Sequence, residues 1–295
     1  MAITNSFAKF IFHVIKQGAN FNSTLTLGRL RLYTQPQALN KASVSAGLNL
    51  DFNATEGQDY SEQFFKIIGA EKLDSMDYSD YENAGIIHDL NVAIPADMHK
   101  KYSIVLDSGT LEHVFNFPVA IKSCMEALEV GGTYIGVTPA NNMMGHGFYQ
   151  FSPELFYRIF TEENGFEVKS MIIGVMGEGD EVEKWYDVKD PSTVRARVTL
   201  RNFKETYLFV AAEKKKQVPV FTSNPFQSDY VATWKKADGT EEAKQSFAKK
   251  AYKENVPEKG QQIIRQIKNY FFKSQKFKDE SIGVIDPSHF SEIKL

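Results

Sequence analysis

The 295-residue sequence predicts an α/β fold, in which a seven-stranded, mostly parallel sheet has one antiparallel end strand and helices on both faces. Short runs rich in β-branched residues alternate with amphipathic segments between Ser23 and Ala212, which is typical of parallel strands joined by helices. Several of these runs end in an acidic residue or a glycine, as strands do at the edge of an open sheet where ligands bind. The last two runs have no convincing helix between them, so we expect them to be antiparallel.

The elements are predicted as follows. Strands are expected at residues 23–27, 72–76, 85–88, 102–106, 133–138, 166–173 and 205–212. Helices are expected at residues 64–68, 116–128 and 152–163, and also near the amino terminus, where Phe7, Phe10, Ile11, Val14 and Ile15 fall on one helical face. Residues 35–63 are polar and predict a long connection with helical turns.

Composition excludes several classes of protein. A net charge of −3 gives no reason to expect a nucleic-acid partner. The single cysteine, Cys124, cannot form an internal disulfide and fits a reducing cytosol. No run approaches the roughly 18 apolar residues of a membrane span. The apolar run at the amino terminus is short and is interrupted by Lys9 and His13, so a signal peptide is not expected. We therefore expect a cytoplasmic protein without a membrane partner.

The stretch from residue 101 to residue 116 carries a recognisable motif. A buried strand ends at Asp107, the chain turns at Ser108-Gly109, and Leu111-Glu112-His113 follow. This arrangement resembles the fourth-strand region of class I S-adenosylmethionine-dependent methyltransferases, where an aspartate-ended strand precedes Leu-Glu-His. The Gly131-Gly132 pair and the strand after it match the same pattern. The resemblance covers roughly residues 25–212 and implies a Rossmann-like sheet and S-adenosylmethionine as cofactor.

The first loop departs from that family's common form. The strand at residues 23–27 ends at Gly28-Arg29, and Leu30-Arg31-Leu32 follow where further glycines would be expected. The run 77–91 is similar to a motif in a bacterial methyltransferase-like group that also carries a Leu-Gly-Arg element in place of the glycine-rich loop. That resemblance implies Asp77 and Asp89 as cofactor residues.

The residues themselves leave alternatives open at both positions. A carboxylate after the second strand can accept both ribose hydroxyls, and Asp77 is favoured over its neighbours Asp74 and Asp80. Asp89 either contacts the adenine end or closes an Asx turn. The expected cofactor-binding set is Gly28, Arg29, Asp77, Tyr78, Asp89, Leu90, Asp107 and Ser108.

The acceptor side is expected in the segment after Asp107 and in the loop 139–149. His146, between two glycines, is the favoured general base, with His113 as the second catalytic candidate. Each also has a structural interpretation: His146 as an exposed loop residue, and His113 as a helix cap or a residue packed at the strand end. Leu111 and Tyr149 are the expected substrate-binding residues. Glu112-His113 alone is too small a ligand set, so no metal is expected.

These observations predict a methyltransferase domain at residues 1–213, followed by a linker and a basic helical extension at 214–295. The predicted function is S-adenosylmethionine-dependent O-methylation of a small-molecule or sugar acceptor. The alternative is a non-catalytic protein that keeps the methyltransferase fold for binding or assembly. An NAD-dependent dehydrogenase is disfavoured because G-x-G-x-x-G is missing. The segment 176–202 either shapes the substrate pocket or makes a homodimer contact.

Overall fold

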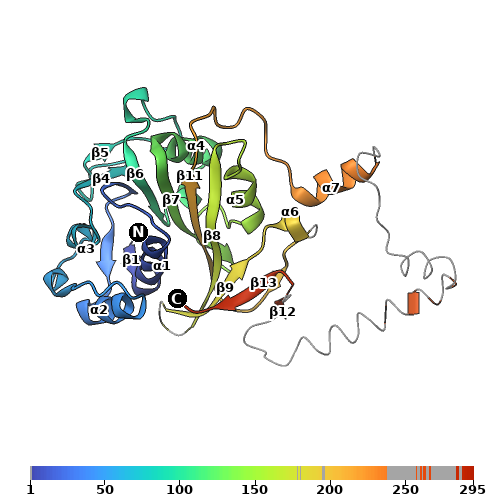
Figure 1. The fold of residues 1–295 in the computed structure, drawn as a ribbon, viewed down its shortest axis with the longest axis horizontal. Helices are drawn as coiled ribbons and strands as arrows, with labels where there is room; N and C mark the ends of the chain where they lie inside the picture. Colours follow the sequence, from blue (N-terminus) through green and yellow to red (C-terminus); the bar gives the residue numbers. More distant parts are fainter. Residues whose placement is uncertain are drawn as a thin grey trace.

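The protein is described by a computed structural model covering residues 2–177, 179, 181–194, 197–237, 284–285 and 288–295, with single positions at 257, 260, 262, 263 and 266. Within these residues nine strands form one sheet, in the order β13-β9-β8-β11-β7-β6-β2-β4-β5 (Figure 1). Helices lie on both faces of this sheet, so the fold is a three-layer α/β arrangement of the kind the sequence predicts.

One half of the sheet is parallel. Its strands are β5 (Ile86–Ile87), β4 (Lys72–Asp77), β2 (Ser23–Leu27), β6 (Tyr102–Ser108) and β7 (Leu128–Asn141). In register, Leu27 pairs with Asp107 and Met76 with Ile86, so the carboxyl ends of neighbouring strands meet at one edge. Every residue of β6 is buried, because the strand lies at the centre of the sheet and is covered on both faces.

The other half is antiparallel. It consists of β11 (Thr206–Lys214), β8 (Phe166–Met176), β9 (Val182–Val188) and β13 (Phe290–Ile293). β11 pairs antiparallel with both β7 and β8, and β9 pairs antiparallel with β8 and β13.

This half departs from the prediction in two ways. The sheet has nine strands among the described residues rather than seven, because part of the segment 176–202 forms β9 and the last residues form β13. The antiparallel strand β11 lies inside the sheet and not at its end.

The two faces of the sheet are covered by different helices. Val105 of β6 belongs to a cluster that contains residues of α4 (Phe117–Ala127) and α5 (Pro153–Ile159). Ile104 and Leu106 belong to the opposite cluster, which contains residues of α1 (Asn5–Lys16), α2 (Pro36–Ser45) and α3 (Glu62–Ile67). Side chains alternate along a strand, so one buried strand supplies both cores.

The remaining described elements are short. They are the 3₁₀ turns η1 (Asn53–Thr55), η2 (Ala96–Met98) and η3 (Leu111–His113), the helices α6 (Pro191–Val194) and α7 (Ser228–Ala237), and the strands β1 (Ala2–Thr4), β3 (Arg31–Tyr33), β10 (Leu200–Arg201) and β12 (Val284–Ile285). β1 pairs in parallel with β3, and β10 pairs antiparallel with β12.

The helix predictions are confirmed, with shifted ends. The amino-terminal helix forms as α1, and its face with Phe7, Phe10 and Ile11 is buried. α5 ends at Ile159, four residues before the expected position, and the Asn164 side chain donates to the Ile159 carbonyl at 2.9 Å. That hydrogen bond satisfies a carbonyl that the ended helix leaves free.

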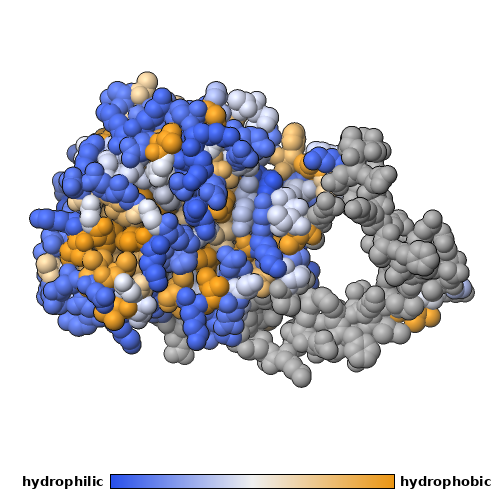
Figure 2. Space-filling view, viewed as in Figure 1, coloured by the Kyte–Doolittle hydropathy of each residue, from blue (hydrophilic) through white to orange (hydrophobic). Residues whose placement is uncertain are grey.

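The face seen in Figure 2 is mostly hydrophilic, with apolar side chains gathered over the region where Figure 1 labels β1, α1 and α2. Among the described residues, no helix is long and apolar enough to cross a membrane. The basic helices predicted within residues 240–278 fall outside the described residues, apart from the single positions named above.

Candidate functional site

A cavity of about 830 Å³ opens at the edge where the parallel strands end. Its walls come from segments that follow β4, β5 and β6, from the amino-terminal segment and from the loop after β7. Small-molecule sites in proteins are typically clefts of about 300–1,000 Å³. The cavity is therefore large enough for a ligand of nucleoside size together with a second small molecule.

One end of the cavity carries two carboxylates. Asp77 is the last residue of β4, and its Oδ1 accepts a hydrogen bond from the Tyr78 amide at 2.7 Å. Asp89 follows β5, and its Oδ1 accepts from the backbone and side-chain nitrogens of Asn91, at 2.9 and 2.8 Å. These hydrogen bonds lower the pKa of Asp89, so its carboxylate is ionised at neutral pH. Asp77, Tyr78, Asp89 and Leu90 all line the cavity, as does Asn91.

The Asx turn left open by the sequence is present at Asp89. It does not withdraw the residue from the cavity, because Asp89 and Leu90 remain in the wall. The turn fixes the carboxylate in place, which suits a binding residue as well as a structural one.

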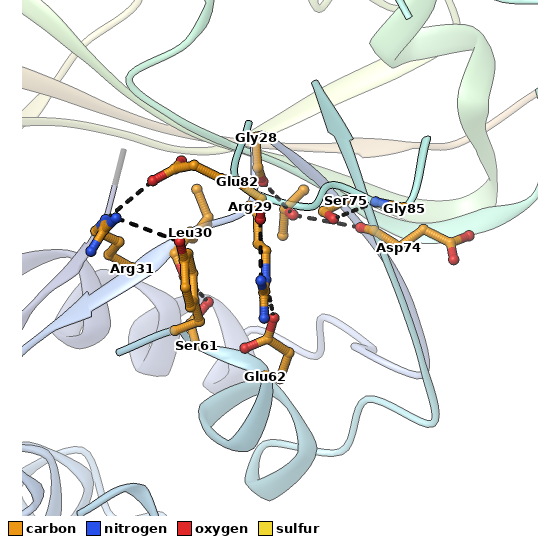
Figure 3. Close-up of polar contacts among 12 residues, drawn as sticks. Gly28, Arg29, Leu30, Arg31, Ser61, Glu62, Asp74, Ser75, Glu82 and Gly85 are labelled. Atoms are coloured by element: carbon orange, nitrogen blue, oxygen red, sulfur yellow. Dashed lines mark hydrogen bonds and ion pairs between the residues drawn. The ribbon is translucent and has the colours of Figure 1, made fainter. Parts of the chain in front are cut away.

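The first loop does not contribute Gly28 or Arg29 to the cavity wall. Figure 3 shows the polar contacts that hold this loop. Gly28 has a φ of +80°, and its amide donates to the Met76 carbonyl at 2.6 Å, so its backbone is bonded within the sheet edge. The Arg29 guanidinium contacts Glu62 at 2.6 Å and lies 3.9 Å from the centre of the Tyr60 ring. Gly28 and Arg29, both expected at the cofactor, are not among the residues that line the cavity.

The amino-terminal segment takes part in the cavity wall instead. Ala2, Thr4, Ser6 and Phe7 line it, and Ser108 at the end of β6 donates its hydroxyl to the Ala2 carbonyl at 2.7 Å. Sequence reasoning missed these residues. The apolar face starting at Phe7 indicated a helix packed on the domain, but no local pattern showed that the strand before it reaches the ligand edge.

The opposite end of the cavity holds three residues with metal-binding or acid–base side chains. Glu112 and His113 lie in η3, and His146 lies in the loop after β7. His146 Nε2 is 3.4 Å from Glu112 Oε1, and the two imidazole rings have centroids 5.4 Å apart. Both catalytic candidates from the sequence therefore meet here, together with a carboxylate that was not among the predicted site residues.

Backbone contacts explain why the loop after β7 reaches η3. The Phe148 and Tyr149 amides both donate to the Glu112 carbonyl, at 2.8 and 3.3 Å. Gly147 has a φ of +76°, and a Cβ there would lie 2.8 Å from that same carbonyl oxygen. Only glycine fits such a close approach with a left-handed backbone, so Gly147 places His146 beside Glu112.

Burial shapes the electrostatics of this end. The Glu112 side chain is fully buried, and neither of its oxygens has a hydrogen-bond partner among the described residues. Burial, and secondarily the charge of Asp107, raise the pKa of Glu112 above its ordinary range. Burial and the nearby His146 lower the pKa of His113, which keeps that imidazole neutral at pH 7.

Three predicted site residues lie outside the cavity lining. Asp107 is buried, accepts from the Thr110 amide at 2.8 Å and from the Tyr134 hydroxyl at 3.3 Å, and its pKa is raised by burial. Leu111 is fully buried in the core. The Tyr149 hydroxyl donates to the Phe115 carbonyl at 2.6 Å. Asp107, Leu111 and Tyr149 are not among the lining residues.

The segment 176–202 contributes to the cavity as well as to the sheet. Met176 and Val182, at the facing ends of β8 and β9, line the wall beside Phe209 of β11. The segment therefore contributes to the cavity wall, and its two expected roles, shaping the substrate pocket or making a homodimer contact, stay predictions.

Comparison with solved structures finds similar chains among methyltransferases. A candidate methyltransferase from Bacillus halodurans has 10% identity and a TM-score of 0.36, covering 70% of this chain and 99% of that one. A candidate S-adenosylmethionine-dependent methyltransferase from Listeria monocytogenes has 14% identity and a TM-score of 0.37, covering 71% and 99%. TehB from Haemophilus influenzae has 16% identity and a TM-score of 0.35, covering 70% and 62%. No family model and no curated protein matches the sequence. Likeness at this level does not identify a reaction, so the function is argued from the site.

Proposed function

We propose that this protein is an S-adenosylmethionine-dependent methyltransferase that methylates a hydroxyl group of a small molecule or sugar. One observation carries the proposal. A single cavity at the carboxyl edge of the parallel strands joins Asp77 and Asp89 at one end to Glu112, His113 and His146 at the other. This is the edge at which open α/β sheets bind nucleotide-like ligands.

The residues at the first end fit the nucleoside part of the cofactor. The Asp77 carboxylate ends a parallel strand, where it can accept hydrogen bonds from both ribose hydroxyls. Asp89, held by its Asx turn, can accept from the adenine amino group, and Leu90 offers an apolar surface to the ring. Tyr78 and Ser108 complete this set. Gly28, Arg29 and Asp107 would act indirectly, by fixing the loops around the cofactor.

The residues at the second end fit the activation of an acceptor. Bound S-adenosylmethionine would supply an activated methyl group, so that the acceptor oxygen gains a methyl, loses its proton, and S-adenosylhomocysteine is left. The protein's part is to align the acceptor and to help remove its proton. His146 and His113 are the proposed catalytic residues, because a neutral imidazole can accept that proton.

The surroundings of this end suit a small organic acceptor. The exposed rings of Phe115 and Phe148 lie edge to face with centroids 6.1 Å apart, beside the His146 loop. Such rings can pack against a sugar or another flat apolar face. Among the residues that the structure describes, none that line the cavity is a lysine or arginine, and the net charge is −3, so a nucleic-acid acceptor is disfavoured. The free, buried Cys124 fits the reducing cytoplasm that we propose as its location.

Calorimetric titration of the full chain with S-adenosylhomocysteine is the first test. Binding with one site per chain is expected, and no binding at millimolar ligand would overturn the proposal. A radiolabelled methyl-transfer screen over hydroxyl-bearing acceptors then separates an enzyme from a binding or assembly protein. Tight cofactor binding without transfer to any acceptor would favour the non-catalytic alternative.

A further inference from the structure

The cluster formed by Glu112, His113 and His146 has the composition of a metal site. We propose that these three side chains bind one divalent transition-metal ion, such as Zn²⁺, at the acceptor end of the cavity. The sequence alone gave no support for this, because Glu112 and His113 are adjacent in the chain and two ligands do not make a site. The third ligand comes from a different loop.

The spacing of the donor atoms fits a single ion. One ligand atom from each residue can be chosen so that all three lie within 4.8 Å of one another, and the closest pair is 3.4 Å apart. Tetrahedral zinc with ligand bonds of about 2.0–2.2 Å places neighbouring donor atoms about 3.3–3.6 Å apart. Glu112 and His146 are already at this separation. His113 and His146 are both exposed side chains, so small rotations can bring the third donor in.

Glu112 supplies an independent reason to expect a cation. Its side chain is fully buried, and both carboxylate oxygens lack a hydrogen-bond partner among the residues the structure describes. Leaving a buried carboxylate without partners is costly, and buried charges in proteins are normally paired or bound to metals. A cation between Glu112 and the two imidazoles would satisfy it.

The loop that carries His146 is held in a way that serves this geometry. Phe148 and Tyr149 bond to the backbone carbonyl of Glu112 rather than to its side chain, which leaves the carboxylate free for a ligand. Gly147 permits the approach, since any Cβ there would collide with that carbonyl. The two ligand-bearing segments are therefore fixed to each other by their backbones, as a preformed site requires.

The donor set selects the class of ion. One carboxylate and two imidazoles suit Zn²⁺, Co²⁺ or Fe²⁺, whereas Mg²⁺ and Ca²⁺ prefer all-oxygen ligands. Three protein ligands leave an open position, and the two histidines both line the cavity. With the ion bound, His113 and His146 would serve as ligands rather than as proton acceptors, and the ion would lower the pKa of the acceptor hydroxyl instead. That role rests on the proposed function, whereas the binding site itself does not.

The test uses the untagged full-length protein, freed of metal with a chelator and then dialysed. Zn²⁺ is titrated by calorimetry, and Co²⁺ by its visible absorption, which reports the coordination geometry. The variants are Glu112→Gln and His146→Ala, and His99→Ala is the control because His99 lies outside the cavity wall. Titration of each variant with S-adenosylhomocysteine, together with circular dichroism, shows whether the fold is retained.

We expect one Zn²⁺ per chain for the unaltered protein and for His99→Ala, and at least a 100-fold weaker affinity in each of the other two variants. The Co²⁺ spectrum should show the intense bands of a four- or five-coordinate ion. Absence of stoichiometric binding, or equal affinity in all variants, would overturn the metal site. Loss of cofactor binding by the unaltered protein with Zn²⁺ binding intact would overturn the proposed function and leave the metal site standing.

Discussion

Glu112 Oε1 and His146 Nε2 lie 3.4 Å apart, although one belongs to the turn after β6 and the other to the loop after β7. β6 and β7 are adjacent and parallel, so the segments that follow them leave the same edge of the sheet. The backbone bonds from Phe148 and Tyr149 to the Glu112 carbonyl then lock the two segments together. This pair and Asp77 line the same cavity, and in the sheet β2 lies between β6 and β4, the strand that ends at Asp77.

Asp77→Ala should weaken S-adenosylhomocysteine binding by about 1.5–3 kcal/mol, or roughly 10- to 150-fold, because hydrogen bonds to a charged group are lost. The measurement is a calorimetric dissociation constant. Asp80→Ala is the matched control, since Asp80 is an exposed acid nearby that does not line the cavity. If the folded Asp77→Ala protein keeps its cofactor affinity and Asp80→Ala loses it, then Asp80 rather than Asp77 binds the ribose.

His146→Ala should lower methyl transfer by about 10²–10⁴-fold, as expected when a group that activates the acceptor is removed. Cofactor affinity should stay nearly unchanged, because Asp77 and Asp89 lie at the other end of the cavity. Steady-state kinetics at saturating cofactor and a separate binding titration check both parts. Weaker cofactor binding with normal turnover at saturation would instead place His146 at the cofactor.

Gly147→Ala should displace the His146 loop, because the added Cβ would meet the Glu112 carbonyl at 2.8 Å and φ is +76°. Backbone strain of this kind costs about 1–3 kcal/mol. Turnover and Zn²⁺ affinity should both fall, with cofactor affinity retained. Gly145→Ala is a close control in the same loop, since nothing lies within 4 Å of its Cβ position. Equal effects of the two substitutions would contradict the positioning role of Gly147.

Glu112→Gln should stabilise the metal-free protein, and by more as the pH rises. Burial raises the folded-state pKa of Glu112 above its ordinary value of 4.5, so the unfolded chain releases this proton first. The free energy of unfolding of the unaltered protein therefore falls as the pH rises above about 4.5, whereas the Glu112→Gln protein has no such dependence from this position. We expect free energies of unfolding that coincide near about pH 4 and differ by an amount on the order of 1–3 kcal/mol at pH 7, measured by denaturant unfolding with chelator present. A pH-independent difference would show that Glu112 is not a strained buried carboxylate.

Lys214 should make stability rise with pH in the alkaline range. Its buried Nζ donates to the Met125 and Leu128 carbonyls at the end of α4, both at 2.8 Å, and burial lowers its pKa from 10.5 to about 8. Between these two values the unfolded chain binds more protons than the folded one, so stability increases by up to about 1.4 kcal/mol per pH unit. The neutral amine can still donate to both carbonyls. The free energy of unfolding of the unaltered protein and of Lys214→Met, measured with denaturant across pH 8–10.5, isolates this contribution. The same pH dependence in both proteins would refute it.

Local patterns in the sequence predicted most of the architecture. Strand Ser23–Leu27 forms with the expected bounds, and the runs ending at Asp77 and Asp107 form β4 and β6, because apolar β-branched runs and their terminating residues are local properties. The same reasoning placed Asp77, Asp89 and His146 at one edge, since residues that follow parallel strands must gather there.

What the sequence could not supply were contacts between distant segments. β9 lies in a mixed acidic and basic stretch without clear alternation, and β13 pairs with β9 although the two are far apart in the sequence. Gly28 was expected to face the ligand, yet its amide donates to the Met76 carbonyl. Ala2 and Thr4 line the cavity instead, and their strand β1 is held there by pairing with β3.

The alternation of strands and helices and the acidic residues at the strand ends can be predicted from the sequence, because both depend on neighbours in the chain. Contacts between distant segments bring His146 to Glu112 and His113, and they bury the Glu112 carboxylate without a hydrogen-bond partner among the described residues. Burial and through-space distance depend on how the loops after β6 and β7 dock. That docking rests on the backbone bonds from Phe148 and Tyr149 to the Glu112 carbonyl and on the close approach of Gly147 to the same carbonyl.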